Sequence, residues 1–215
     1  GTYIEWLSIE NPDIAADCDN PLIRQQISDL KKGEGFGQVC LRTNDIEQLA
    51  ASLIVKGFSC RIFDGQRKKT DGTLLKWKML FIEEKYGHQM PYPFFIEWGK
   101  SDGERLEELQ DSGLLNSFSI KQITYLVKDA EEAASKWAPF LEDMDTKRYK
   151  DEKEELEGVQ VNIGSVSVFF AETTSPKKAI SLKEHGERPV AVAFTELEKS
   201  DNRVMWGGCY QLSVN

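Results

Sequence analysis

Two glutamates with nearly the same apolar neighbours are the strongest candidates for chemistry in this chain. Glu5 stands in a Tyr-Ile-Glu-Trp motif and Glu97 in a Phe-Ile-Glu-Trp motif. A carboxylate among aromatic and aliphatic side chains on a strand is costly unless it is paired, bound to a metal or facing a wet cavity. The pattern therefore predicts that both glutamates act as metal ligands or general bases. The alternative is a salt bridge, or a strand whose glutamate faces solvent.

An amide and two histidines are the next residues that could take part. Gln38 offers an amide oxygen, a weak hard ligand that suits Mg, Mn, Ni or Zn only with help from carboxylates. It could equally bond to a neighbouring strand. His88 and His185 are the only histidines, so the two histidines and one carboxylate of a mononuclear iron oxygenase are not readily supplied. His88 precedes the Glu97 strand, where it could line a pocket or be an exposed loop residue.

A basic hairpin and a tryptophan are candidates for binding a substrate. Arg67 is followed by Lys68 and Lys69. Because a guanidinium suits carboxylates and phosphates, Arg67 could neutralise an anionic substrate at the rim of a pocket. A solvated hairpin tip is the alternative. Trp77 could belong to an aromatic wall around a ligand or to the core.

Composition narrows the range of partners. The chain has 215 residues, a formal charge of −9 and 40% hydrophobic residues, which is enough for a folded core. The excess of acidic residues disfavours nucleic acid and anionic lipid, and no apolar run approaches the ~20 residues that span a bilayer. The four cysteines form no C-x-x-C pair. We therefore expect a cytoplasmic protein with a small-molecule ligand and without nucleic-acid or membrane partners; a homodimer remains open.

The elements that would position these residues follow a β-α-β-β-β order. Asp45 is expected to cap a helix that ends at Gly57. Strands are expected at residues 36–43, 58–63, 74–82 and 93–99. Asp-Gly within 67–73 predicts the turn of a hairpin. Residues 2–9 alternate as a strand from the very start of the chain, so we expect the beginning of a preceding unit to be missing.

The same order is expected again in the second half of the chain. Residues 100–117 are polar and acidic, which indicates a linker with a helical turn. Asp129 is expected to cap a second helix, bent or ended by Pro139. The charged residues 142–157 indicate an exposed loop or hairpin. Strands are expected at residues 118–127, 159–163 and 165–171, and a closing hairpin from residues 189–194 and 205–214.

The repeat is the most informative feature of the sequence. Residues 38–45 match residues 122–129, since both begin with Gln, run apolar and reach a capping Asp seven residues later. The two Ile-Glu-Trp strands form a second echo at similar spacing. Both matches in the same order are much less expected by chance than either one, so we interpret the chain as repeated βαβββ units.

This sequence resembles the vicinal-oxygen-chelate superfamily, which includes glyoxalase I, bleomycin-resistance proteins and extradiol dioxygenases, and more narrowly the glyoxalase-like domain proteins of bacteria. The resemblance rests on the strand and cap at 36–45, on Arg-x-x-Thr-Asp-Gly-x-x-x-x-Trp at 67–77 and on Phe-Phe-Ile-Glu-Trp-Gly at 94–99. It implies an α+β fold in which paired βαβββ units form curved mixed sheets around a small ligand, with the first unit truncated at its N-terminus. The implied division is a glyoxalase-like domain at 1–99, a linker at 100–117 and a second, degenerate half at 118–215.

The resemblance also implies a site. In the superfamily, one residue on the first strand and a glutamate on the last strand of each paired unit commonly hold a metal ion. By position this implies Gln38, Glu97 and Glu5 as ligands of Zn, Ni, Mn or Mg. In the third unit Gln122 takes the first-strand position. Phe169 stands near the place where its glutamate is expected, so that unit is not expected to carry the ligand pair.

Two functions follow from the resemblance. One is a metal-dependent lyase or isomerase of the glyoxalase type that acts on a small oxygenated substrate, with the metal as Lewis acid and Glu5 or Glu97 moving the proton. The alternative is a non-catalytic binding module, like the drug-sequestering bleomycin-resistance members, that uses the aromatic cup without a metal. The fold alone does not decide between them.

Overall fold

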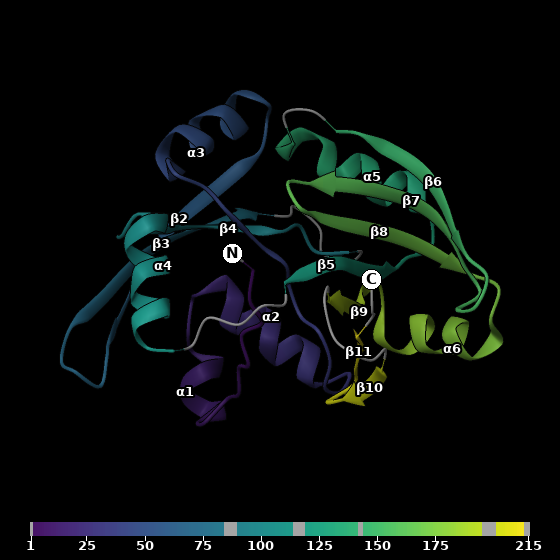
Figure 1. The fold of residues 1–215 in the computed structure, drawn as a ribbon, viewed down its shortest axis with the longest axis horizontal. Helices are drawn as coiled ribbons and strands as arrows, with labels where there is room; N and C mark the ends of the chain where they lie inside the picture. The colour runs from purple at the N-terminus through teal and green to yellow at the C-terminus, as the bar shows by residue number, and fades with distance from the viewer. Residues whose placement is uncertain (1, 84–89, 114–118, 142–143, 195–200, 213–215) are drawn as a thin grey trace. The chain divides into compact units, whose positions relative to one another are not determined.

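The computed structural model describes residues 2–83, 90–113, 119–141, 144–194 and 201–212 (Figure 1). The chain forms two compact units. Val39–Gly87 and Tyr92–Ser117 make up the four-stranded unit, and Gly1–Gln38, His88–Pro91 and Phe118–Asn215 make up the seven-stranded unit. The predicted division into a domain at 1–99, a linker at 100–117 and a second half at 118–215 stays a prediction.

The four-stranded unit is a complete βαβββ repeat. Its elements are β1 (Cys40–Arg42), α3 (Ile46–Val55), β2 (Ser59–Lys68), β3 (Leu74–Glu83) and β4 (Phe94–Trp98), and its strand order is β1-β4-β3-β2. β1 is parallel to β4, and the other neighbours are antiparallel. Asp45 caps α3 by accepting a hydrogen bond from the N–H of Gln48, as predicted. The buried side chains of α3 place this helix against one face of the sheet.

A ten-residue helix stands where a linker with one helical turn was expected. α4 (Asp102–Asp111) begins with a capping box, in which Ser101 and Glu104 each accept a hydrogen bond from the other's backbone N–H. Ion pairs from Glu108 to Lys69 and Lys100 tie the helix to its own unit. The polar composition concealed α4 because it has no buried apolar stripe and depends on its cap and its charges.

The seven-stranded unit repeats the topology and then extends it. β5 (Ile120–Leu126), α5 (Ala130–Trp137), a short 3-10 turn (Ala138–Phe140), β6 (Thr146–Asp151), β7 (Leu156–Ile163) and β8 (Val166–Thr173) give the order β5-β8-β7-β6, which matches β1-β4-β3-β2. β9 (Arg188–Phe194) pairs with the other edge of β5, followed by β11 (Gly208–Leu212) and β10 (Asp201–Met205). The predicted α+β fold of repeated βαβββ units is confirmed.

Several local predictions were wrong. Residues 2–9 form no strand, because an alternating pattern makes a strand only where its backbone pairs with a neighbour; α1 (Pro12–Ala16) and α2 (Pro21–Leu30) follow. The first strand covers only Cys40–Arg42 of the expected 36–43. A further helix, α6 (Pro176–His185), lies in a lysine-rich stretch that had no assigned element. The closing hairpin is formed by β10 and β11, whereas β9 and β11 are parallel.

The core of the seven-stranded unit lies between α5 and the sheet (Figure 1). Trp137 of α5 is fully buried, and its ring centroid lies 5.7 Å from that of Tyr125 and 5.4 Å from that of Phe170. Since successive strand residues face opposite sides, Phe169 points away from α5. On that second face Leu126, Leu156, Phe169 and Ala171 pack together with Leu182 of α6.

No helix in the described ranges is long and apolar enough to cross a membrane.

Candidate functional site

Glu97 lies on the face of the four-stranded sheet that carries α3. Its Oε2 accepts a hydrogen bond at 2.6 Å from the N–H of Ile46, the first residue of α3. That N–H has no partner within the helix, and the helix dipole favours a negative charge beside it. Lys78, opposite Glu97 across β3–β4, bonds to Glu47 of α3. The pKa of Lys78 is raised, first by the hydrogen bond to Glu47 and less strongly by the charge of Glu97.

Glu172 performs the same task in the second repeat. Its Oε1 accepts a hydrogen bond at 2.9 Å from the N–H of Ala130, the first residue of α5. The prediction that Phe169 stands at the glutamate position was therefore wrong, because Glu172 is the counterpart of Glu97 and Phe169 that of Phe94. A signal for this was present in the sequence, since Phe-Phe-x-Glu occurs at both 94–97 and 169–172.

Removing either helix-capping carboxylate is expected to destabilise its unit. Glu97→Ala and Glu172→Ala should each lower the free energy of unfolding by about 1–2 kcal/mol, because a helix N–H loses its charged acceptor. Chemical denaturation measures the loss, and hydrogen exchange should speed up at the amides of Ile46 and Ala130 respectively. Glu107→Ala, at an exposed position of α4, is the control and should change stability by less than about 0.5 kcal/mol. Unchanged protection of the Ile46 amide in Glu97→Ala would contradict the capping role.

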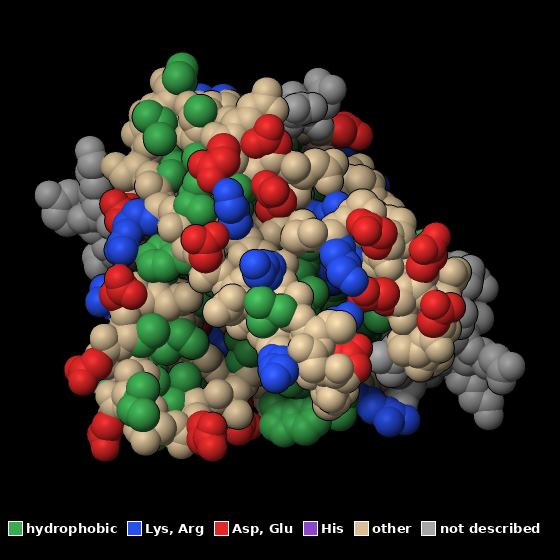
Figure 2. Space-filling model, turned by 90° about the vertical axis from the view of Figure 1, so that its left-hand side faces the viewer, with side chains coloured by type: hydrophobic (Ala, Val, Ile, Leu, Met, Phe, Trp, Pro, Cys, Tyr) green, Lys and Arg blue, Asp and Glu red, His purple; other side chains and the backbone are tan. Residues whose placement is uncertain are grey.

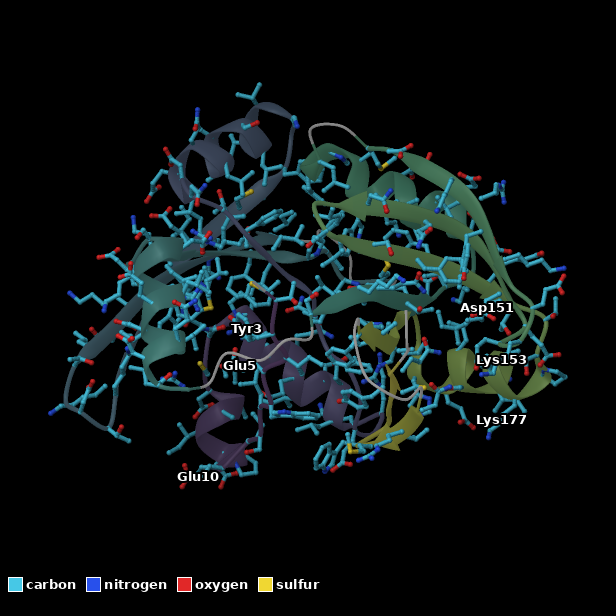
Figure 3. All side chains as sticks on the ribbon, viewed as in Figure 1. Tyr3, Glu5, Glu10, Asp151, Lys153 and Lys177 are labelled. Carbon is cyan, nitrogen blue, oxygen red and sulfur yellow. The ribbon has the colours of Figure 1, made fainter. Side chains whose placement is uncertain are left out.

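The three predicted metal ligands are divided between the two units. Glu97 belongs to the four-stranded unit, and Glu5 and Gln38 to the seven-stranded unit. Glu5 is exposed on the N-terminal segment, where Figure 3 labels it together with Tyr3. Gln38 is half-buried, and its Oε1 is buried without a hydrogen-bond partner in the described structure. Catalysis by Glu5 or Glu97, and metal binding by this set, stay predictions.

Two of the predicted substrate-binding residues share one face of the four-stranded sheet. Gly65 is opposite Trp77 and Arg67 is opposite Leu75 across β2–β3. Arg67 and Trp77 therefore project from the same side. Arg67 is exposed, and Trp77 is half-buried. Their roles with a substrate stay predictions, and so does that of His88, which lies outside the described residues.

The ring of Trp77 belongs to an aromatic pair on this face. Its centroid lies 5.6 Å from that of Trp98. Arg105 of α4 lies over the Trp98 ring, with its guanidinium carbon 4.0 Å from the centroid. A cation over an indole is an attractive arrangement, so α4 covers part of this aromatic wall.

The basic hairpin is partly neutralised by α4. Lys69 Nζ lies 2.7 Å from the carboxylate of Glu108, which also contacts Lys100. These hydrogen bonds, first that of Lys100 and then that of Lys69, lower the pKa of Glu108. Figure 2 shows one face of the molecule, on which Lys and Arg side chains lie among Asp and Glu side chains rather than in one patch.

A group of uncharged polar side chains lies on the face of the seven-stranded sheet opposite α5. Gln160 of β7 donates hydrogen bonds through Nε2 to Gln122 Oε1 and Ser167 Oγ, both at 2.9 Å. Gln122 Nε2 in turn donates to Thr124 Oγ1 at 3.3 Å. These four residues are termed the amide cluster. Gln160 and Thr124 are only 8% and 4% exposed, whereas Gln122 and Ser167 are half-buried.

The donor groups in the described residues do not fit a metal centre. Glu97 and Glu172 both bond to helix N-termini on the helix-covered faces of their sheets. The amide cluster has no carboxylate, and amide oxygens bind divalent ions weakly without one. Among the residues that the structure describes, no three His, Cys, Asp or Glu side chains converge on one point. No metal-dependent step follows from these residues.

Two βαβββ repeats with the same strand order, each with its helix on one face of the sheet, define an α+β protein of the vicinal-oxygen-chelate type. The chain belongs to the glyoxalase-like domain family, whose model matches residues 1–141. A comparison with curated proteins found no match.

The chain is similar to several solved structures. A hypothetical protein from Staphylococcus aureus is similar with a TM-score of 0.77 at 18% identity, covering 96% of this chain and 79% of that one. A hypothetical protein from Bacillus halodurans C-125 and methylmalonyl-CoA epimerase from Mycobacterium tuberculosis reach TM-scores of 0.38 and 0.36 at 10% and 9% identity. They cover 46% and 45% of this chain, and 96% and 87% of their own length. The similarity to the staphylococcal protein shows the fold alone.

Proposed function

We propose that this protein binds a small molecule at the amide cluster and acts as a binding module of the bleomycin-resistance type. The observation that carries the proposal is the presence of four uncharged, hydrogen-bonding side chains beside the apolar residues of the same sheet face. Small-molecule sites combine apolar walls with a few such polar groups. Membership of the glyoxalase-like domain family supports a small-molecule ligand.

The last-strand glutamates favour binding over metal-dependent catalysis. In both repeats this carboxylate is hydrogen-bonded to the first N–H of a helix. The same hydrogen bond in both repeats indicates a structural role for these glutamates. Both carboxylates point to the helix-covered face of their sheet, whereas Gln122, at the first-strand ligand position, lies on the opposite face. The amide cluster can hold and orient a ligand, but it contains no group that exchanges a proton near neutral pH.

A metal-dependent lyase or isomerase is the second candidate. It is favoured by Gln38, whose buried Oε1 has no hydrogen-bond partner in the described structure and is thus available to a cation. The metal of this alternative would be Zn, Ni, Mn or Mg.

Metal content separates the two candidates. Protein purified without chelator should contain far less than one divalent ion per chain if it is a binding module. Near-stoichiometric metal that is lost in Glu97→Gln but retained in Glu172→Gln would overturn this proposal. Glu172→Gln is the matched control, since it removes the same helix-capping charge from the other repeat.

Ligand contacts at the amide cluster are the direct test. A panel of small aromatic alcohols, amides and carboxylates should shift the side-chain amide resonances of Gln122 and Gln160 in NMR spectra. The indole resonances of Trp77 and Trp98 in the other unit serve as the internal reference. If saturating ligands of every class leave the two glutamine amides unshifted, the proposed binding site is wrong.

A further inference from the structure

The hydrogen bonds of the amide cluster leave one strong acceptor unused. Both N–H groups of Gln160 are engaged, one with Gln122 and one with Ser167. Ser167 Oγ also contacts the carbonyl oxygen of Lys121 at 3.3 Å, to which it donates. Gln160 Oε1, in contrast, is buried without a hydrogen-bond partner in the described structure. A buried acceptor in this state destabilises the folded protein, and a donor from a ligand would remove that cost.

The fold does not require a glutamine at this position. Lys78 is opposite Glu97, and Glu157 is opposite Glu172, so Lys78 of β3 and Glu157 of β7 hold equivalent positions. Three residues further along these strands, Phe81 is the counterpart of Gln160. Phe81 is buried and stacks on Phe94, with ring centroids 5.2 Å apart. The sister repeat therefore fills the same place with an apolar side chain.

The rest of the cluster differs between the repeats in the same sense. Thr124 is paired with Phe169, and Cys40 with Phe94, so the hydroxyl of Thr124 corresponds to a thiol. Gln122, two residues before Thr124, corresponds to Gln38, two residues before Cys40. Tyr92 takes the place of Ser167, because each stands two residues before the matching phenylalanine. The second repeat thus carries two amides, Gln122 and Gln160, where the first has one.

The strand neighbours of the unused acceptor on β5, β8 and β9 are uncharged. Phe169 is opposite Gln160 across β7–β8, and Ala191 and Ala193 are opposite Thr124 and Gln122 across β5–β9. Lys147 is opposite Gln160 on β6 and is exposed, so its charge is solvated. An ionic group would lose its hydration beside Gln160 without a counter-charge, which is costly.

We propose that Gln160 is a specificity-determining residue that selects uncharged ligands with a hydroxyl or amide N–H donor and an apolar body. The donor would bond to Gln160 Oε1, and the body would lie beside the half-buried Gln122 and Ala193. This inference rests on the proposed function, because it specifies the ligand class of the same site.

Three matched probes test the inference: phenol, which donates; anisole, which has the same ring without the donor; and benzoate, which is anionic. Phenol is expected to bind at least about tenfold more tightly than anisole or benzoate, since only phenol satisfies the buried acceptor. Binding is followed by NMR titration of the Gln122 side-chain amide, which is present both in the unmodified protein and in Gln160→Leu. Gln160→Leu should reduce phenol binding by about tenfold, to the level of anisole. Gln66→Leu, at an exposed strand position, is the control and should leave phenol binding unchanged.

The outcomes separate this inference from the proposed function. Equal binding of phenol and anisole, or tighter binding of benzoate, would overturn the inference while the binding site stands, provided that the Gln122 and Gln160 amides shift. Phenol binding that Gln160→Leu leaves unchanged would do the same. If neither the three probes nor the wider panel of ligands shifts these amides, both this inference and the proposed function are wrong. The three probes are compared on the unmodified protein, so this test stands even if Gln160→Leu does not fold.

Discussion

Replacement of Trp137 by alanine is expected to lower the free energy of unfolding of the seven-stranded unit by about 3–5 kcal/mol. The side chain is fully buried between α5 and the sheet, where it contacts the rings of Tyr125 and Phe170. Its removal loses both the transfer free energy of a large aromatic group and the contacts around the resulting cavity. Denaturant unfolding followed by circular dichroism measures the change.

Two further variants make this expectation specific. Trp137 Nε1 is buried without a hydrogen-bond partner among the described residues, so Trp137→Phe removes an unsatisfied donor and should cost less than half as much as Trp137→Ala. Trp206→Ala is the control, because Trp206 is 58% exposed and should cost no more than about 1.5 kcal/mol through its contact with Trp6. If Trp137→Ala is no more destabilising than Trp206→Ala, the packing of α5 on the sheet is wrong.

Addition of one methyl group at Gly158 is expected to destabilise the seven-stranded unit. A Cβ there would lie 2.1 Å from the carbonyl oxygen of Phe170 and 2.9 Å from Cβ of Ala130. Neither atom belongs to a flexible side chain, so β7 or α5 must shift. Gly158→Ala should cost about 1–3 kcal/mol or more by overpacking, measured by the same unfolding experiment.

The control for this substitution has the opposite expected sign. Gly103 lies in the first turn of α4, and a Cβ there would meet nothing within 4 Å. Gly103→Ala should therefore stabilise by about 0.4–1 kcal/mol, because alanine has less backbone freedom to lose on folding. Equal effects of the two substitutions would contradict the close approach of β7 to β8 and α5.

Much of the fold could be predicted from short-range patterns. Asp45 and Asp129 bond to backbone N–H groups three residues ahead, at Gln48 and Glu132. The Asp-Gly turn closes through a hydrogen bond from Gly72 N–H to the carbonyl of Lys69. Such contacts depend on residues that are neighbours in the chain, so type and spacing were enough to predict them. Patterns without a partner failed, as the alternating residues 2–9 show.

The candidate site depended on contacts that no local pattern carries. Glu97 meets the N–H of Ile46 across 51 residues, and Gln160 meets Gln122 across 38 residues. The sequence indicated that a glutamate among apolar neighbours needs a partner, a metal, a wet cavity or solvent, and Glu97 has a partner in the N–H of Ile46. It could not indicate which partner, because that depends on strand register, and a shift of one residue moves a side chain to the opposite face of its sheet.

By itself, the sequence determined the repeated βαβββ order, the starts of α3 and α5 and the presence of unusual polar residues on apolar strands. The tertiary structure decided which face each of them occupies. It turned the glutamates of β4 and β8 toward helix N-termini and gathered the amides of β5 and β7 on the other face of their sheet. The physical reason is that helix caps and turns are satisfied within a few residues, whereas buried carboxylates and amides must be satisfied by whatever the folded sheet brings beside them.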